Sequence, residues 1–126
     1  MKALVGILIV TVLKCASFSA ASISPLSGKY QTTNQCQSGT VCMGYCRVQD
    51  NCSQRNVVQA VLFPHPYAHK PNMLTTGLNY IDASNGRNTR LSVTKETITP
   101  FGFNVRFNSW DNSITYDACV DWLACP

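Results

Sequence analysis

The sequence has few of the side chains that perform enzyme chemistry. Its two histidines are His65 and His69, and its acidic residues number six. Because Pro64 and Pro66 forbid the helix that would aim both histidines at one metal ion, we expect the two imidazoles in an exposed loop. The sequence offers no Ser-His-Asp or Cys-His grouping for nucleophilic catalysis, so the chain is predicted not to be an enzyme.

A closely spaced pair of carboxylates is also missing. Asp117 and Asp121 share one face of a predicted strand, where a rise of about 3.3 Å per residue separates them by about 13 Å. Glycosidases hold their two carboxyl groups about 5 to 9.5 Å apart. We therefore expect solvated strand carboxylates here and no catalytic dyad.

Clustered charge and long apolar runs are absent as well. Ten basic and six acidic residues give a net charge of +4, and the cations are scattered singly, which leaves no electrostatic basis for binding nucleic acid. The longest apolar run, residues 3–13, follows Lys2 and has 11 residues, whereas a membrane helix needs about 20. This pattern is typical of a signal peptide. We predict that residues 1–21 are removed and that the chain is secreted to the extracellular space without membrane insertion.

The cysteines indicate a disulfide framework. Of seven, Cys15 leaves with the predicted leader, and six remain in an oxidising compartment that favours pairing. Four lie within residues 36–52, but gaps of five, three and five residues lack the close pair typical of structural zinc, so we expect neither a metal nor a cofactor. The predicted disulfide cysteines are Cys36, Cys42, Cys46, Cys52, Cys119 and Cys125.

Residues 22–56 are rich in Gly, Ser, Thr, Gln and Cys, which predicts a loop-like, cysteine-rich N-terminal arm. On a straight strand Cys119 and Cys125 would lie about 20 Å apart, whereas a disulfide joins Cα atoms about 4.4 to 6.8 Å apart. At least one of them is therefore expected to reach back to a cysteine of the arm. Within the arm, Asn51 begins a candidate glycosylation sequon, Asn-Cys-Ser.

From residue 57 onward short β-prone runs alternate with turns, and helix signals and internal repeats are lacking. Strands are expected at residues 57–63, 73–81, 90–94, 97–99, 103–108 and 114–122, with a tight turn at Asn85-Gly86. In the last strand Ile114, Tyr116 and Ala118 are expected to share the core face. The pattern predicts an all-β fold, an antiparallel sandwich or barrel.

One polar group combines an indole with hydrogen-bonding side chains. Trp110, Asp111 and Tyr116 lie within seven residues, and Arg90 comes one long hairpin earlier. An aromatic plane beside carboxylate and guanidinium groups suits sugar recognition, because apolar C–H faces stack on the ring while polar groups bind hydroxyls. The alternative is a core tryptophan at a strand end beside a polar turn.

These residues resemble the H-type lectin family, the domain of invertebrate agglutinins that bind GalNAc and galactose and of the C-terminal part of discoidins. The resemblance covers residues 57–123. Its elements are Phe63, Pro66-Tyr67, Pro71, Leu74, Ile81-Asp82, Asn88-Thr89-Arg90, Pro100, Gly102-Phe103, Trp110, Tyr116 and Val120-Asp121-Trp122.

The resemblance implies that residues 57–126 form a six-stranded antiparallel β-sandwich, assembled as a homotrimer or a hexamer with sugar sites between subunits. The family's arginine matches Arg90, its cleft aromatic Trp110 and its tyrosine Tyr116, while Asp111 stands where some members have histidine. A family aspartate in the loop before the strand that ends at Phe63 falls at Cys52 here, so only Asp50 or Asn51 could substitute for it.

The predicted function is a secreted carbohydrate-binding lectin for glycans with terminal galactose or GalNAc, with an agglutinating or defensive role. Two alternatives stay open. One is a secreted structural or protein-binding β module that has lost sugar binding. The other is a disulfide-rich inhibitor or toxin-like effector, which only the arm favours.

Overall fold

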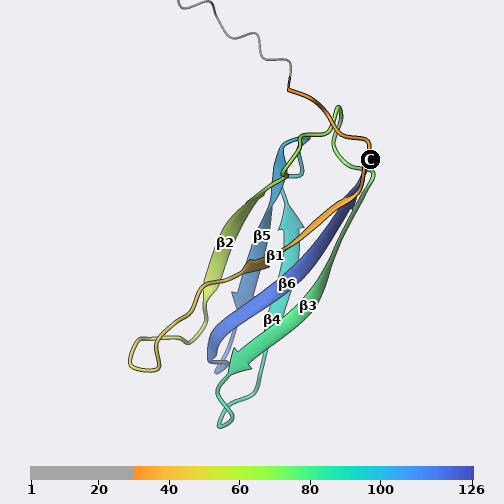
Figure 1. The fold of residues 1–126 in the computed structure, drawn as a ribbon. Helices are drawn as coiled ribbons and strands as arrows, with labels where there is room; N and C mark the ends of the chain where they lie inside the picture. Colours follow the sequence, from red (N-terminus) through yellow and green to blue (C-terminus); the bar gives the residue numbers. More distant parts are fainter. Residues whose placement is uncertain (1–29) are drawn as a thin grey trace, which may run out of the picture.

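The structure, a computed structural model, describes residues 30–126. The predicted signal peptide and residues 22–29 of the predicted arm lie outside the described residues. Two three-stranded antiparallel sheets face each other, in the orders β1-β6-β3 and β2-β5-β4 (Figure 1). The strands are β1 (Gln37–Cys42), β2 (Asn56–Leu62), β3 (Met73–Ala83), β4 (Leu91–Glu96), β5 (Gly102–Ser109) and β6 (Thr115–Cys125). The predicted all-β, six-stranded antiparallel sandwich is thus confirmed. Residues 30–126 contain no helix long and apolar enough to cross a membrane.

The core lies between the central strands of the two sheets. On β5 the alternation of apolar and polar residues works as predicted, with Phe103, Val105 and Phe107 buried. Phe63, Phe103 and Trp122 form an aromatic cluster with ring centroids 5.7 to 5.8 Å apart, a spacing at which aromatic pairs attract beyond their buried area. These contacts hold the two sheets together.

The alternation predicted for the last strand is confirmed from Ala118 onward, where Ala118 is buried, but it is wrong before that residue. Thr115 is fully buried, while Ile114 and Tyr116 are partly exposed. The reason is a register shift against β3: Asp117 pairs with Asp82, but the next pair joins Thr115 to Ala83, so Tyr116 is an extra residue. Because one strand has an extra residue at such a β-bulge, the residues before Tyr116 face the opposite side from the one that the alternation after it predicts.

The predicted arm is not loop-like throughout, because residues 37–42 form strand β1 beside β6. The strand has few apolar residues, and Gly39 lies so close to the ring of Trp122 that an added Cβ would sit 2.9 Å from it. The strand predicted at residues 97–99 does not form. Thr97 has a φ of 51°, which an extended strand does not allow.

Disulfides fasten the arm to the last strand, as predicted. Cys36 pairs with Cys125 and Cys42 with Cys119, which bridges β1 to β6 at both ends. The remaining pair, Cys46 with Cys52, closes a short loop between β1 and β2. Both C-terminal cysteines therefore reach back to the arm, and the three bonds use all six predicted cysteines.

Candidate functional site

The polar group singled out in the sequence lies at the end of the sandwich opposite the C-terminus (Figure 1). Leu91, the first residue of β4, pairs with Ser109, the last of β5. Arg90 and Trp110 therefore flank the end of this ladder from its two strands. The loops joining β1 to β2 and β3 to β4 extend at the same end (Figure 1).

Arg90 and Asp111 form an ion pair that is open to solvent. Their side chains are 35% and 58% exposed, and Trp110 is 45% exposed. The alternative of a core tryptophan is therefore wrong. An exposed pair of this kind contributes little to stability, about 0 to 1 kcal/mol, so its groups remain available for a ligand.

A buried serine fixes this pair in place. Ser113 is fully buried, and its Oγ accepts a hydrogen bond from the backbone N–H of Arg90 at 3.0 Å. Its own N–H donates to the carbonyl of Trp110 at 3.2 Å. Asp111, inside this turn, has a φ of 54°, a left-handed conformation that aspartate tolerates better than most residues. The turn thus holds Asp111 against the start of β4.

Arg55 positions the neighbouring loop, a role that no sequence pattern indicated. Its guanidinium donates to the carbonyls of Thr115 at 3.1 Å, Tyr116 at 2.9 Å and Gly44 at 2.7 Å. Charge-assisted bonds to carbonyls are stronger than neutral ones. They attach the loop between β1 and β2 to the beginning of β6.

Two adjacent hollows open beside the Arg90–Asp111 pair. The first, of about 390 Å³, is lined by Ser53, Gln54, Arg87, Asp111, Asn112 and Ile114. The second, of about 350 Å³, is lined by Asn85, Gly86, Arg87, Asn88 and Asn112. Arg87 and Asn112 line both. Asn112 belongs to the polar segment 110–116 that the sequence singled out, whereas Gln54 and Arg87 carried no recognisable sequence signal, because they come from two other loops.

The predicted site residues are only partly brought together. Arg90, Asp111 and Trp110 lie at one strand end, as described above. Tyr116, at the bulge of β6, is half-buried, and its carbonyl accepts hydrogen bonds from Arg55 and from the N–H of Cys46 at 2.7 Å. Of the predicted binding residues, Asp111 alone lines one of the two hollows; Arg90, Trp110, Tyr116 and Asp50 line neither.

Asp50 and Asn51 both lie in the disulfide-closed loop between β1 and β2. Asp50 is exposed, and its N–H donates to the carbonyl of Arg47 at 2.9 Å. Asn51 is also exposed. Its Oδ1 accepts two hydrogen bonds from Ser53, one from the hydroxyl at 2.6 Å and one from the backbone N–H at 3.2 Å. The loop therefore presents both side chains at the surface.

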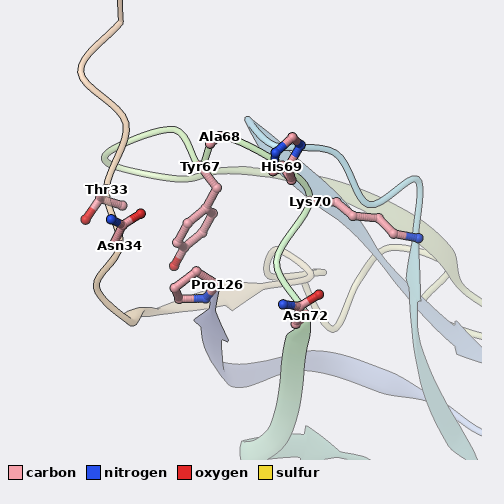
Figure 2. Close-up of a pocket in the computed structure, with 8 residues that line it drawn as sticks. All are labelled: Thr33, Asn34, Tyr67, Ala68, His69, Lys70, Asn72 and Pro126. Atoms are coloured by element: carbon pink, nitrogen blue, oxygen red, sulfur yellow. The ribbon is translucent and has the colours of Figure 1, made fainter.

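A different cavity, of about 320 Å³, opens at the other end of the sandwich (Figure 2). Its lining residues are Thr33, Asn34, Tyr67, Ala68, His69, Lys70, Asn72 and Pro126. Tyr67 is 3% exposed, and its hydroxyl lies 2.8 Å from the carbonyl oxygen of Ala124, so its ring is part of the packing. Figure 2 shows Lys70 extending away from Tyr67 and Pro126. We therefore regard the Arg90–Asp111 end as the candidate site.

A disulfide-linked β-sandwich with open polar hollows at one end belongs to the class of small ligand-binding β domains. Residues 58–125 match the model of the H-type lectin domain, which covers more than half of the chain. The chain belongs to the H-type lectin domain family, as its sequence resemblance predicted. It is therefore a member of a family of carbohydrate-binding domains, which are generally not enzymes.

Similar proteins support this assignment. The chain is 31% identical over 90 residues to discoidin-2 of Dictyostelium discoideum, an alignment covering 70% of this chain and 34% of that protein. It is 36% identical over 64 residues to a Fuscovulum blasticum protein named ATP synthase subunits region ORF 7, covering 51% of this chain and 55% of that protein. Solved structures of D. discoideum discoidin II superpose with TM-scores of 0.62 and 0.63 at 28% identity, covering 71% and 76% of this chain and 36% and 38% of discoidin II. The chain thus spans about half or less of these relatives.

Proposed function

We propose that this chain is a secreted lectin that binds glycans ending in galactose or GalNAc, without a metal or cofactor. The observation that carries the proposal is the solvent-open ion pair of Arg90 and Asp111 at the strand end where the half-exposed Trp110 directly precedes Asp111 in the chain. The three disulfides and the lectin family also support an extracellular location.

Each group has a distinct role in the proposed site. The ring of Trp110 stacks on the apolar C–H face of the sugar. Arg90 donates to sugar hydroxyls and Asp111 accepts from them, so the pair recognises a hydroxyl that can do both. Asp111 is negatively charged where some members of the family carry histidine, so it accepts a hydrogen bond where an imidazolium would donate one.

The proposal includes assembly into a homotrimer or a hexamer with sugar sites between subunits. Tyr116 and Asp50, which lie outside the hollows of a single chain, would serve a site that a second copy completes. Shallow sites bind single sugars weakly, and several sites on one assembly raise the effective affinity for a clustered glycan surface. An agglutinating or defensive role follows from that multivalency.

A glycan array tests the proposal, with light scattering of the same sample to give the mass of the assembly. We expect binding to terminal galactose or GalNAc and a loss of about 10- to 100-fold in Arg90→Ala, since a charge-assisted hydrogen bond is worth about 1.5 to 3 kcal/mol. Arg47→Ala removes an equal charge from an exposed residue outside the hollows and serves as the matched control.

Two results would contradict the proposal. Binding of no glycan above background would favour a structural or protein-binding module. A monomeric mass would contradict the site between subunits. Sugar binding by a site within the single chain would then be decided by the array alone.

A further inference from the structure

Two residues, Arg87 and Asn112, line both hollows, and Arg87 is the charged one of the two. The other lining side chains are mainly neutral hydrogen-bonding groups. The amides come from Gln54, Asn85, Asn88 and Asn112, and a hydroxyl comes from Ser53. Such groups can donate to any oxygen, but a guanidinium placed among them favours an oxygen that carries negative charge.

The two hollows, counted together with Arg90, which pairs with the lining residue Asp111, carry one net positive charge. Asp111 is the single carboxylate in their lining, and it is already paired with Arg90. The ion pairs among residues 30–126 are Arg90 with Asp111 and Arg106 with Glu96, so Arg87 has no carboxylate partner there. One uncompensated cation therefore remains in the hollows.

The backbone around Arg87 is held by a turn. The N–H of Arg87 donates to the carbonyl of Ser84 at 3.4 Å, and the N–H of Gly86 donates to the hydroxyl of Ser84 at the same distance. The residue is exposed, so its planar guanidinium can meet two oxygens of a bound group at once. The turn fixes where the side chain starts, next to Asn88 and Asn112.

Resting on the proposed lectin function, we infer that these hollows bind an anionic substituent carried by the galactose-type sugar. Arg87 binds the anion, and the amides of Asn88 and Asn112 donate further hydrogen bonds. The Arg90–Asp111 pair binds the neutral hydroxyls of the same glycan. Each hollow exceeds the lower size of ligand pockets, about 300 Å³, so together they have room for a sugar and its substituent. The anion is a sulfate ester or a carboxylate, which share this chemistry.

Calorimetric titration with three soluble galactosides tests the inference: a neutral one, a sulfated one and a sialylated one carrying a carboxylate. We expect the wild type to bind at least one anionic galactoside about 10-fold or more tighter than the neutral one, with a preference that shrinks as salt is added. Comparing the sulfated with the sialylated galactoside shows whether the bound anion is a sulfate ester or a carboxylate. Inorganic sulfate should compete.

Variants at Arg87 make the assignment specific. In Arg87→Gln the ratio of anionic to neutral affinity should fall to about one, and Arg87→Lys should restore part of it because the charge returns. Arg47→Gln removes an exposed arginine outside the hollows and should leave the ratio unchanged. Thermal melts check that the variants fold.

The outcomes separate the two proposals. Equal affinity of the wild type for neutral and charged galactosides overturns the anion site and leaves the lectin function standing. A preference that survives Arg87→Gln also overturns it. Binding of none of the galactosides refutes the lectin function itself.

Discussion

The two disulfides between β1 and β6 are nested, and this predicts that their contributions to stability are not additive. Cys36 and Cys125 are 89 residues apart in the sequence, and Cys42 and Cys119, which lie inside that loop, are 77 residues apart. In the chain-entropy account, either bond alone stabilises the fold by about 4.5 kcal/mol, because it restricts the unfolded chain.

With one bond present, the second closes a much shorter loop. Six residues separate Cys36 from Cys42, and six separate Cys119 from Cys125, so the added loop has about 12 residues and the same relation gives about 3 kcal/mol. Removing either bond by Cys→Ala pairs should therefore cost about 3 kcal/mol, and removing both about 7.5 kcal/mol. The double loss exceeds the sum of the single losses by about 1.5 kcal/mol.

Urea denaturation of the wild type, the two single-bond variants and the variant lacking both bonds measures these free energies of unfolding. Because small domains are stable by about 5 to 15 kcal/mol, the variant lacking both bonds is measured in added osmolyte and extrapolated to zero osmolyte. The bond between Cys46 and Cys52, with a separation of 6 residues, is the control, and its removal should add independently. Additive losses for the nested pair, within about 0.5 kcal/mol, would refute the reasoning.

Two further predictions concern the sheets. A Cβ added at Gly102 would lie 2.1 Å from the carbonyl oxygen of Val61, so Gly102→Ala should destabilise the fold by about 1 to 3 kcal/mol or more. The control is Gly77→Ala, where an added Cβ meets nothing within 4 Å, and it should be neutral or slightly stabilising in the same urea titration. Equal losses of stability in the two variants would contradict this prediction. The hydroxyl of Tyr80 donates to Asp117 at 2.5 Å, and this hydrogen bond, followed by desolvation, raises the pKa of Tyr80 to about 12 from 10.0. The folded state holds this proton more tightly, so the stabilisation is complete below about pH 10 and is lost as the pH rises towards 12. Thermal melts across this range should show a fall that Tyr80→Phe lacks, and an identical pH profile in the variant would count against the assignment.

The sequence by itself determined the β class, the family and the principal polar group. The alternation of Phe103, Val105 and Phe107 needs only neighbours two residues apart, so the core face of β5 could be predicted from local pattern. Likewise the family pattern indicated Arg90 and Trp110 as candidate site residues. Both kinds of signal are carried by a short stretch of chain or by motif order.

Contacts between distant segments were decided only by the tertiary structure. Strand β1 has too few apolar residues to be recognised, and it forms because β6 and two disulfides hold it. The bulge at Tyr116 depends on the register with β3. The hollows combine side chains of three loops, and Arg87 gained its significance from the pairing of Asp111 with Arg90. A sequence pattern records which residues alternate, but which segments meet depends on the free energy of the whole packed chain.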